Sequence, residues 1–196
     1  SLNGKIEGFQ IVLPLLQELA KPSIKVRHWD ELKVLVKVEF DQEGADFTLE
    51  YILSMSMETV ADEVLEITDG ADKQEKIEAE IKEITEMWEI REFAFKDWKG
   101  RPIPTLQATG VLTEELEESM MQMQTFLTMR HVAPFREEAT ELLASISDAA
   151  DTLEQWVKVQ LMWGGLESVF TGGDIAKQLP MEAKKFSKVD KDWTKI

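Results

Sequence analysis

An apolar residue stands at every seventh position in the stretch that follows Pro134. The series is Phe135, Leu142, Ala149, Trp156, Trp163 and Phe170, and a second series of Ala139, Ile146 and Leu153 runs beside it until Gln160 and Glu167 break it. Such spacing places side chains on one side of a long α-helix. We expect a helix of about 54 Å that packs along most of its length on a neighbour, unless Gly164 and Gly165 end or bend it.

A second helical stripe precedes this one. Its members are Met57, Val60, Val64, Ile67, Ala71, Ile77, Ile81, Ile84 and Trp88, spaced by three and four residues. Residues 57–92 carry thirteen acidic and four basic side chains, so the stripe runs along an otherwise acidic helix. Asp69 and Gly70 form a candidate kink.

Proline, glycine and capping residues divide the rest of the chain. Pro14, Pro22 and the turn at residues 41–44 bracket two short helices, near residues 15–20 and 26–36. Residues 93–110 predict a β-hairpin with its turn at residues 98–101, and Pro102 and Pro104 restrict the second strand to an edge. Thr113 is the expected N-cap of the next helix.

These elements predict a mainly α fold, an elongated bundle of long amphipathic helices with one small β-hairpin. We divide this single fragment into short helices at residues 1–56, a long acidic helix at 57–92, the hairpin at 93–110, a helix pair at 111–171 and a basic C-terminal helix at 172–196. The start at Ser1, without a methionine, indicates an excised fragment.

The charge of the chain excludes several classes of partner. Lys and Arg number 22 against 38 Asp and Glu, which gives a net charge of −16. This excess of carboxylates repels nucleic acids and anionic lipids, so we expect no nucleic-acid, membrane or direct microtubule contact. No cysteine is present, which excludes disulfides and thiolate sites and favours a cytoplasmic setting.

The glycine pair at residues 172–173 is a candidate phosphate-binding loop. A P-loop requires glycines four residues apart followed by Lys and Ser or Thr, whereas here Asp174 follows the pair directly. We expect a corner between helices, with Gly172 left-handed, Asp174 as a cap and Pro180 in the first turn of the last helix. His28 and His131 are isolated, so we expect structural roles for both and no catalytic, cofactor or metal residues.

Aromatic residues supply most of the expected core. The residues assigned to a force-bearing core are Trp29, Trp88, Phe135, Leu142, Trp156, Trp163, Phe170 and Trp193. Each buried indole N–H is expected to find an acceptor. Trp98 stands in the hairpin turn instead, where either a core position or an exposed partner contact is possible. Lys184 and Lys185 of the basic end are the other candidate partner contacts.

Several motifs together resemble one known family. LPLLQELA at residues 13–20, RHWDEL at 27–32, WVKVQLMWGGLESVF at 156–170, GDIAKQLP at 173–180 and FSKVDKDW at 186–193 resemble the linker region of dynein heavy chains. The resemblance spans nearly the whole chain, and residues 169–180 look most like axonemal outer-arm heavy chains of the gamma type. Gly164 and Gly165 depart from the bulkier residues of that family, which leaves the straightness of the long helix open.

The resemblance implies the N-terminal half of an all-helical, arch-like linker that lies across a ring of AAA+ modules. Its implied role is mechanical, and the fragment itself would hold no cofactor, with ATP and magnesium bound elsewhere in the parent motor. Implied partners are the AAA+ ring of the same heavy chain and neighbouring dynein subunits, in the cytoplasm and cytoskeleton of a ciliary or flagellar axoneme. A helical interaction scaffold, recruiting a partner through the hairpin and the basic end, is the alternative. An independent enzyme is disfavoured because no nucleophile–base pair, metal set or phosphate loop is found.

Overall fold

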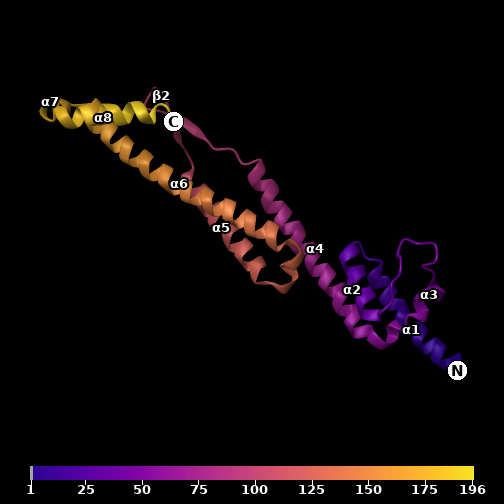
Figure 1. Cartoon of the computed structure of the whole chain (residues 1–196). Coiled ribbons are helices and arrows are strands. Elements are labelled where there is room, and N and C mark those ends of the chain that lie inside the picture. Colours follow the sequence, from indigo (N-terminus) through magenta and orange to yellow (C-terminus); the bar gives the residue numbers. More distant parts are fainter. Residues whose placement is uncertain (1) are drawn as a thin grey trace. The chain divides into compact units, whose positions relative to one another are not determined.

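The computed structural model describes residues 2–196, with side chains from residue 8 onward. Its elements are α1 (Leu2–Leu19), α2 (Val26–Val36), α3 (Leu49–Ser54), the 3-10 helix η1 (Met57–Val60), α4 (Ala61–Glu89), β1 (Phe95–Trp98), β2 (Arg101–Leu106), α5 (Thr109–Thr128), the 3-10 helix η2 (Arg130–Phe135), α6 (Arg136–Thr171), α7 (Ile175–Gln178) and α8 (Pro180–Trp193) (Figure 1). The predicted mainly α fold with one hairpin is confirmed. None of these helices has an apolar stretch long enough to span a bilayer.

The chain divides into two compact units. Unit 1 comprises residues 2–83 and Met129–Arg136, and unit 2 comprises Ile84–Thr128 and Glu137–Ile196. Unit 1 has an aliphatic core in which the buried members are Val12, Leu15, Leu19, Leu32, Ile52, Met55, Met57 and Val64. Trp29 packs at its edge, with its ring edge-on to Phe40 and Phe47.

Polar contacts tie α2 and the segment before it to α4 within unit 1. Asp72 accepts hydrogen bonds from Ser23 Oγ at 2.6 Å and Lys21 Nζ at 3.0 Å. Gln74 Oε1 lies 2.9 Å from Nε2 of the buried His28, whose Nδ1 accepts from the backbone N–H of Lys25 at 2.9 Å. The His28 side chain therefore provides an acceptor for an unpaired backbone N–H at the start of α2. This contact agrees with the structural role expected for His28.

Helix α1 corrects one expectation. The short helix near residues 15–20 is the end of a longer one, and Pro14 lies inside it. A proline in a helix interior removes one backbone hydrogen bond, but its side chain here faces solvent while Val12, Leu15 and Leu19 are buried on the other side. Burial of these three apolar side chains stabilises the helix and offsets the hydrogen bond that Pro14 removes.

The 3-10 helix η2 belongs to unit 1. Val132 and Phe135 are buried, the Arg27 guanidinium lies 5.0 Å from the Phe135 ring, and Arg130 pairs with Glu66 at 2.9 Å. His131 lies beside Gly70, and burial together with the positive charges of Arg130 and Lys73 lowers its pKa. Helix α4 is continuous through Asp69 and Gly70.

Helix α5 of unit 2 starts one turn earlier than expected. It begins at Thr109, so the expected N-cap Thr113 is wrong and its hydroxyl donates to the Thr109 carbonyl at 2.9 Å inside the helix. The extra turn buries Leu112, which favours helix over a cap at Thr113. Trp88, in the last turns of α4, donates from Nε1 to Ser119 of α5 at 3.0 Å.

Helix α6 is unbroken over 36 residues and passes through Gly164 and Gly165. The second of the two apolar series is the better buried, because Ala139, Ile146 and Leu153 are covered whereas Ala149 is exposed. The expectation that the first series forms the seam is therefore wrong at Ala149. Burial continues along the second series to Glu167, which the sequence pattern treats as a break.

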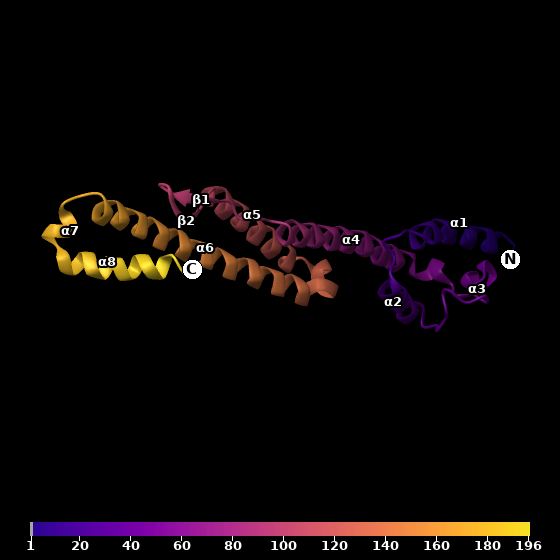
Figure 2. The ribbon, with the colours of Figure 1, turned by 90° about the horizontal axis from the view of Figure 1, so that it is seen from above.

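The corner after α6 also differs from its expected geometry. Gly100 is the one glycine with positive φ in the described chain, so Gly172 is not left-handed, and Asp174 makes no side-chain cap. The Asp174 carboxylate instead pairs with Lys177 at 3.3 Å. Pro180 does begin α8 as predicted. After α7 the chain reverses and α8 runs back beside α6 (Figure 2), where Phe186 stacks on Phe170.

Candidate functional site

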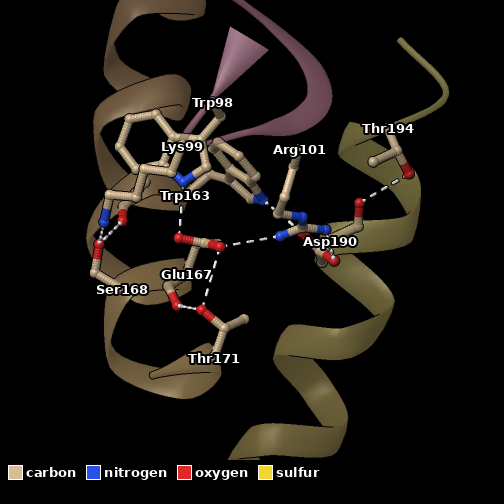
Figure 3. Close-up of polar contacts among 10 residues, drawn as sticks. Trp98, Lys99, Arg101, Trp163, Glu167, Ser168, Thr171, Asp190 and Thr194 are labelled. Atoms are coloured by element: carbon tan, nitrogen blue, oxygen red, sulfur yellow. Dashed lines mark hydrogen bonds and ion pairs between the residues drawn. The ribbon is translucent and has the colours of Figure 1, made fainter. Parts of the chain in front are cut away.

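The β1–β2 hairpin meets α6 and α8 in unit 2, and we call this contact the junction. Its members are Trp98, Lys99 and Arg101 of the hairpin, Gln160, Trp163, Gly164, Glu167 and Ser168 of α6, and Asp190 and Trp193 of α8. Lys99 and Gly100 both have positive φ, at 47° and 81°, which suits a tight hairpin turn. Trp98 pairs with Arg101 across this turn, so both side chains reach the helices from one place (Figure 3).

Aromatic rings form the apolar part of the junction. The Trp163 ring lies 5.3 Å from that of Trp98 and 5.6 Å from that of Trp193, with which it stacks. Trp163 is buried, and Trp98 also covers Gly164. A Cβ at residue 164 would lie 2.8 Å from Cη2 of Trp98, so glycine is required here by the close approach of the indole.

A carboxylate buried within the helix face anchors the hairpin. The Glu167 side chain is 5% exposed, and it accepts hydrogen bonds from Trp98 Nε1 at 2.7 Å, Arg101 Nη1 at 3.1 Å and Thr171 Oγ1 at 3.2 Å (Figure 3). A buried charge is stable only when it is paired and hydrogen-bonded, and these three donors meet that requirement.

Arg101 joins α6 to α8. Its Nη2 donates to Asp190 at 2.7 Å while its Nη1 donates to Glu167, and Asp190 also accepts from Trp163 Nε1 at 3.0 Å. One guanidinium therefore ties the hairpin to both helices, a geometry that the planar fork of arginine permits.

The acid groups of the junction titrate below their ordinary range. Burial acts to raise the pKa of Glu167, but hydrogen bonds from Trp98, Arg101 and Thr171 outweigh it, so the pKa is lowered overall. The hydrogen bond from Arg101 lowers the pKa of Asp190, with a further contribution from Trp163 against an opposing effect of burial. Asp190 in turn raises the pKa of Arg101, as does Glu167. All three groups are charged at neutral pH.

Gln160 and Lys99 extend the attachment along α6. The Gln160 amide accepts from the backbone N–H of Leu106 at 2.7 Å and donates to the Leu106 carbonyl at 3.0 Å. This side chain therefore satisfies the edge of β2 much as a neighbouring strand would. Lys99 Nζ lies 2.6 Å from Ser168 Oγ, one turn beyond Gly164.

The family of the chain follows from comparison with known proteins. A model described as dynein heavy chain, N-terminal region 2, matches residues 1–196. The chain belongs to this dynein heavy chain family. The resemblance found in the sequence motifs is thereby confirmed.

Similar members of the family are axonemal and flagellar heavy chains. Human dynein axonemal heavy chain 8 is 36% identical over 197 residues, which cover 100% of this chain and 4% of the relative. The gamma chain of the flagellar outer arm of Chlamydomonas reinhardtii is 36% identical over 193 residues, covering 97% and 4%. The dynein-1-alpha heavy chain of the inner arm I1 complex of the same alga is 33% identical over 196 residues, covering 98% and 4%. This chain thus spans 4% of the length of these relatives.

The structure gathers four of the aromatic residues expected in the core, together with Trp98, into one region of unit 2. Trp163 is buried, and Trp156, Phe170, Trp193 and Trp98 are partly buried around α6 and α8. The other expected core residues lie apart from it: Trp29 and Phe135 in unit 1, and Trp88 and Leu142, both partly buried, elsewhere in unit 2.

Of the two positions left open for Trp98, the structure has the packed one, because its partly buried indole lies on Trp163 and Gly164 and donates to Glu167. The expectation that every buried indole N–H finds an acceptor needs correction. Indole N–H groups do find acceptors at Trp88, Trp98 and Trp163. Among the described residues, however, none accepts from the buried Nε1 atoms of Trp156 and Trp193. Lys184 and Lys185 are both exposed.

Sequence reasoning missed the polar members of the junction. The sequence pattern assigns no contact to Arg101 or Asp190, treats Glu167 as a break in the second series, and treats Gly164 as a possible break and a departure from the family. A signal was present, since Gln160 and Glu167 continue the second heptad series after Leu153. A polar residue at a buried seam position indicates a specific partner. No group of three or more histidines and carboxylates able to hold a metal occurs among the described residues.

Proposed function

We propose that this chain is the N-terminal half of the linker of a dynein heavy chain, a mechanical element that transmits ATP-driven changes of the AAA+ ring to the tail of the motor. The observation that carries the proposal is the family match over residues 1–196. The relatives' names support an axonemal setting, in a cilium or flagellum.

The junction supports a load-bearing role. A lever that works by rigid-body movement needs elements that keep their relative positions under force. Arg101 bridges Glu167 and Asp190, Gln160 holds the edge of β2, and three tryptophans fill the space between them. Force applied to the hairpin is therefore shared by α6 and α8 through several bonds of different direction.

In this proposal, ATP hydrolysis takes place elsewhere in the parent motor. ATP and magnesium would bind the AAA+ ring, and the side chains of this chain would keep its helices in a fixed relative arrangement. Its proposed partners are that ring and neighbouring dynein subunits. On this account, a change in the junction alters movement more than it alters ATP turnover.

The test is a junction variant in the whole motor. Trp163→Ala, with or without Trp156→Ala, removes aromatic packing from α6. We expect microtubule gliding velocity to fall several-fold while basal ATP turnover stays within about twofold, because the catalytic modules are separate from the altered helix.

Val111→Ala is the matched control, since Val111 is exposed on α5 of the same unit. It should change neither quantity. Unchanged gliding in a Trp163→Ala motor whose hairpin has demonstrably lost hydrogen-exchange protection would contradict the mechanical role.

The scaffold alternative recruits a partner through the hairpin and the basic end; Trp98 is engaged within unit 2, so the lysines of the basic end are the contacts to test first. Lys184 and Lys185 are exposed, and within the part of the chain that the structure describes neither has an acidic partner. Reversal of both charges to Glu should release a recruited acidic partner from the purified motor without changing the melting temperature, if the scaffold role holds. Retention of every subunit would exclude it.

A further inference from the structure

Helix α8 carries an excess of basic side chains in a chain whose net charge is −16. Residues 180–195 hold five lysines against three acidic residues, which gives this segment a net charge of +2. Three of the lysines, Lys184, Lys185 and Lys188, surround Ser187, and all four side chains are exposed. Within the described chain none of these three lysines has an acidic partner. Their charges are therefore available to a protein that approaches Ser187.

The sequence before Ser187 is the second feature of this segment. It reads Lys184-Lys185-Phe186-Ser187, and no acidic residue lies within two positions of the serine on either side. No other serine or threonine of the 196 residues has basic residues at both the second and the third position before it. Kinases that have an acidic substrate groove select their serine by the charge of these two positions.

The Ser187 hydroxyl is also free to react. It is exposed, and no atom of the described chain accepts a hydrogen bond from it. Hydroxyls of α6 differ, since Ser168 and Thr171 donate to backbone carbonyls one turn earlier at 2.9 Å and 2.6 Å. Esterification of such a hydroxyl breaks a helix contact, whereas esterification of Ser187 breaks none.

We propose that Ser187 is a phosphorylation site for a basophilic serine/threonine kinase, one that recognises lysine or arginine before the serine. In the reaction, Ser187 Oγ bonds to the γ-phosphorus of kinase-bound ATP, the bond from that phosphorus to the β,γ-bridging oxygen breaks, and ADP leaves. The hydroxyl proton passes to the catalytic aspartate of the kinase. The modification depends on neither the lever role nor the scaffold role, so it can fail separately from both.

The phosphate cancels the positive charge of α8. A phosphoserine carries about −1.5 to −2 charges at pH 7, against the net +2 of residues 180–195. Lys184 lies three residues before Ser187 and Lys191 four residues after it, spacings that bring both lysines beside the phosphate on the helix surface. Release of an acidic partner from the basic end is the expected consequence, and this consequence, unlike the modification, rests on the scaffold role.

Phosphorylation requires α8 to open. A kinase binds its substrate as an extended segment, whereas Ser187 lies in the middle of a helix. Phe186 is the one buried residue of α8, against six in α6, and helices with few buried contacts open locally more often. The bond from Arg101 to Asp190 opposes this opening. We therefore expect the junction to control the rate of phosphorylation.

The direct test is incubation of the 196-residue chain with ATP, magnesium and the catalytic subunit of cyclic-AMP-dependent protein kinase, a basophilic enzyme. Cleavage after Glu182 and Asp190 releases residues 183–190 for mass spectrometry. We expect phosphate on Ser187 and none on this peptide in Ser187→Ala. Phosphate confined to other residues, or no phosphate at all, would overturn the proposal.

Lys184→Gln combined with Lys185→Gln tests the recognition. The control, Lys191→Gln combined with Lys195→Gln, removes the same charge on the other side of Ser187. The first pair should lower the kcat/KM of the kinase for this chain at least about tenfold, and the control should stay within about twofold. Equal losses would show that the kinase responds to net charge and would overturn the assignment of Ser187 as a specific site.

Arg101→Gln releases α8 from the hairpin and should speed phosphorylation of Ser187 by about fivefold or more at equal kinase concentration. An equal rate would overturn the control by the junction. In the heavy chain purified with phosphatase inhibitors, we expect phosphate on a fraction of the Ser187 peptides. Its absence there, both before and after treatment with the kinase, would exclude Ser187 as a modification site of the motor.

Discussion

The two units of this chain are held together by different chemistry. Unit 1 has a core of leucine, isoleucine, valine and methionine side chains, with ion pairs at its surface such as Lys21–Asp72. The junction of unit 2 buries indole rings together with a charged carboxylate, Glu167, and its guanidinium partner, Arg101. An aliphatic core tolerates substitutions that conserve volume, whereas a buried polar network is destabilised when any one member is lost.

This difference indicates which parts of the chain define a single geometry. Apolar contacts in unit 1 are non-directional. Contacts at the junction are directional, because Glu167 must face Trp98 and Arg101 at the same time. We therefore expect substitutions at the junction to change shape and stability together, and comparable changes of surface pairs in unit 1 to have little effect.

The largest expected effect is that of Trp163→Ala. This side chain is buried between two other indoles and donates to Asp190, and loss of a buried aromatic side chain costs about 3–5 kcal/mol. Urea unfolding followed by region-resolved hydrogen exchange should show the loss in the hairpin, α6 and α8. Exchange in α2 should be unchanged, and equal destabilisation of α2 would break the comparison between the units.

Glu167→Gln should cost about 2–3 kcal/mol at pH 7, because the charge-assisted bond from Arg101 is lost in a buried site. The wild-type contribution depends on pH with a definite sign. The pKa values of Glu167 and Asp190 lie below their ordinary values of 4.5 and 3.8, so their stabilisation is fully present above those values and is lost as pH falls through the lowered ones. Acid titration of hairpin protection should show a weaker pH dependence in the variant; an identical profile would exclude Glu167 as an acid-sensitive group.

Gly164→Ala should destabilise unit 2 by about 1–2 kcal/mol, because the added methyl group would overlap the Trp98 ring. The expected sign is opposite to that for an exposed helical glycine, where alanine is favoured. Near-ultraviolet circular dichroism reports the tryptophan packing. A stable Gly164→Ala protein with an unchanged spectrum would show that Trp98 does not lie on the helix.

Asp72→Asn should have the smallest effect, below about 1 kcal/mol, since its side chain is 38% exposed and its partner Lys21 is similarly solvated. Chemical denaturation at low and high salt measures it, and the small difference should shrink further with added salt. A loss as large as that of Glu167→Gln would mean that polar pairs matter equally in both units.

The sequence predicts the helices well and the junction poorly. Three- and four-residue spacing identifies α4, and the seven-residue spacing identifies α6, because burial of a stripe is a local property of the helix. Pro14 and Thr113 give the wrong starts for α1 and α5. The burial of Leu15 and Leu112 in the folded chain outweighs the local preference of proline and threonine for helix starts.

Arg101 and Asp190 stand 89 residues apart, and no local pattern connects them. Their pairing depends on how α8 returns to α6 and on the position of the hairpin, which are long-range features. Gly164 illustrates the same limit. A pair of glycines suggests a break in a helix, whereas the structure shows one glycine accommodating Trp98 in an unbroken helix.

Native-state hydrogen exchange at the Leu106 amide tests most directly the claim that the hairpin and α6 form one body. This N–H donates to the Gln160 side chain rather than to a strand, so it exchanges whenever the hairpin leaves the helix. The account predicts that Leu106 exchanges with the same opening free energy as the central amides of α6. Fast exchange at Leu106 while α6 stays protected would show that the hairpin detaches on its own, which contradicts the account.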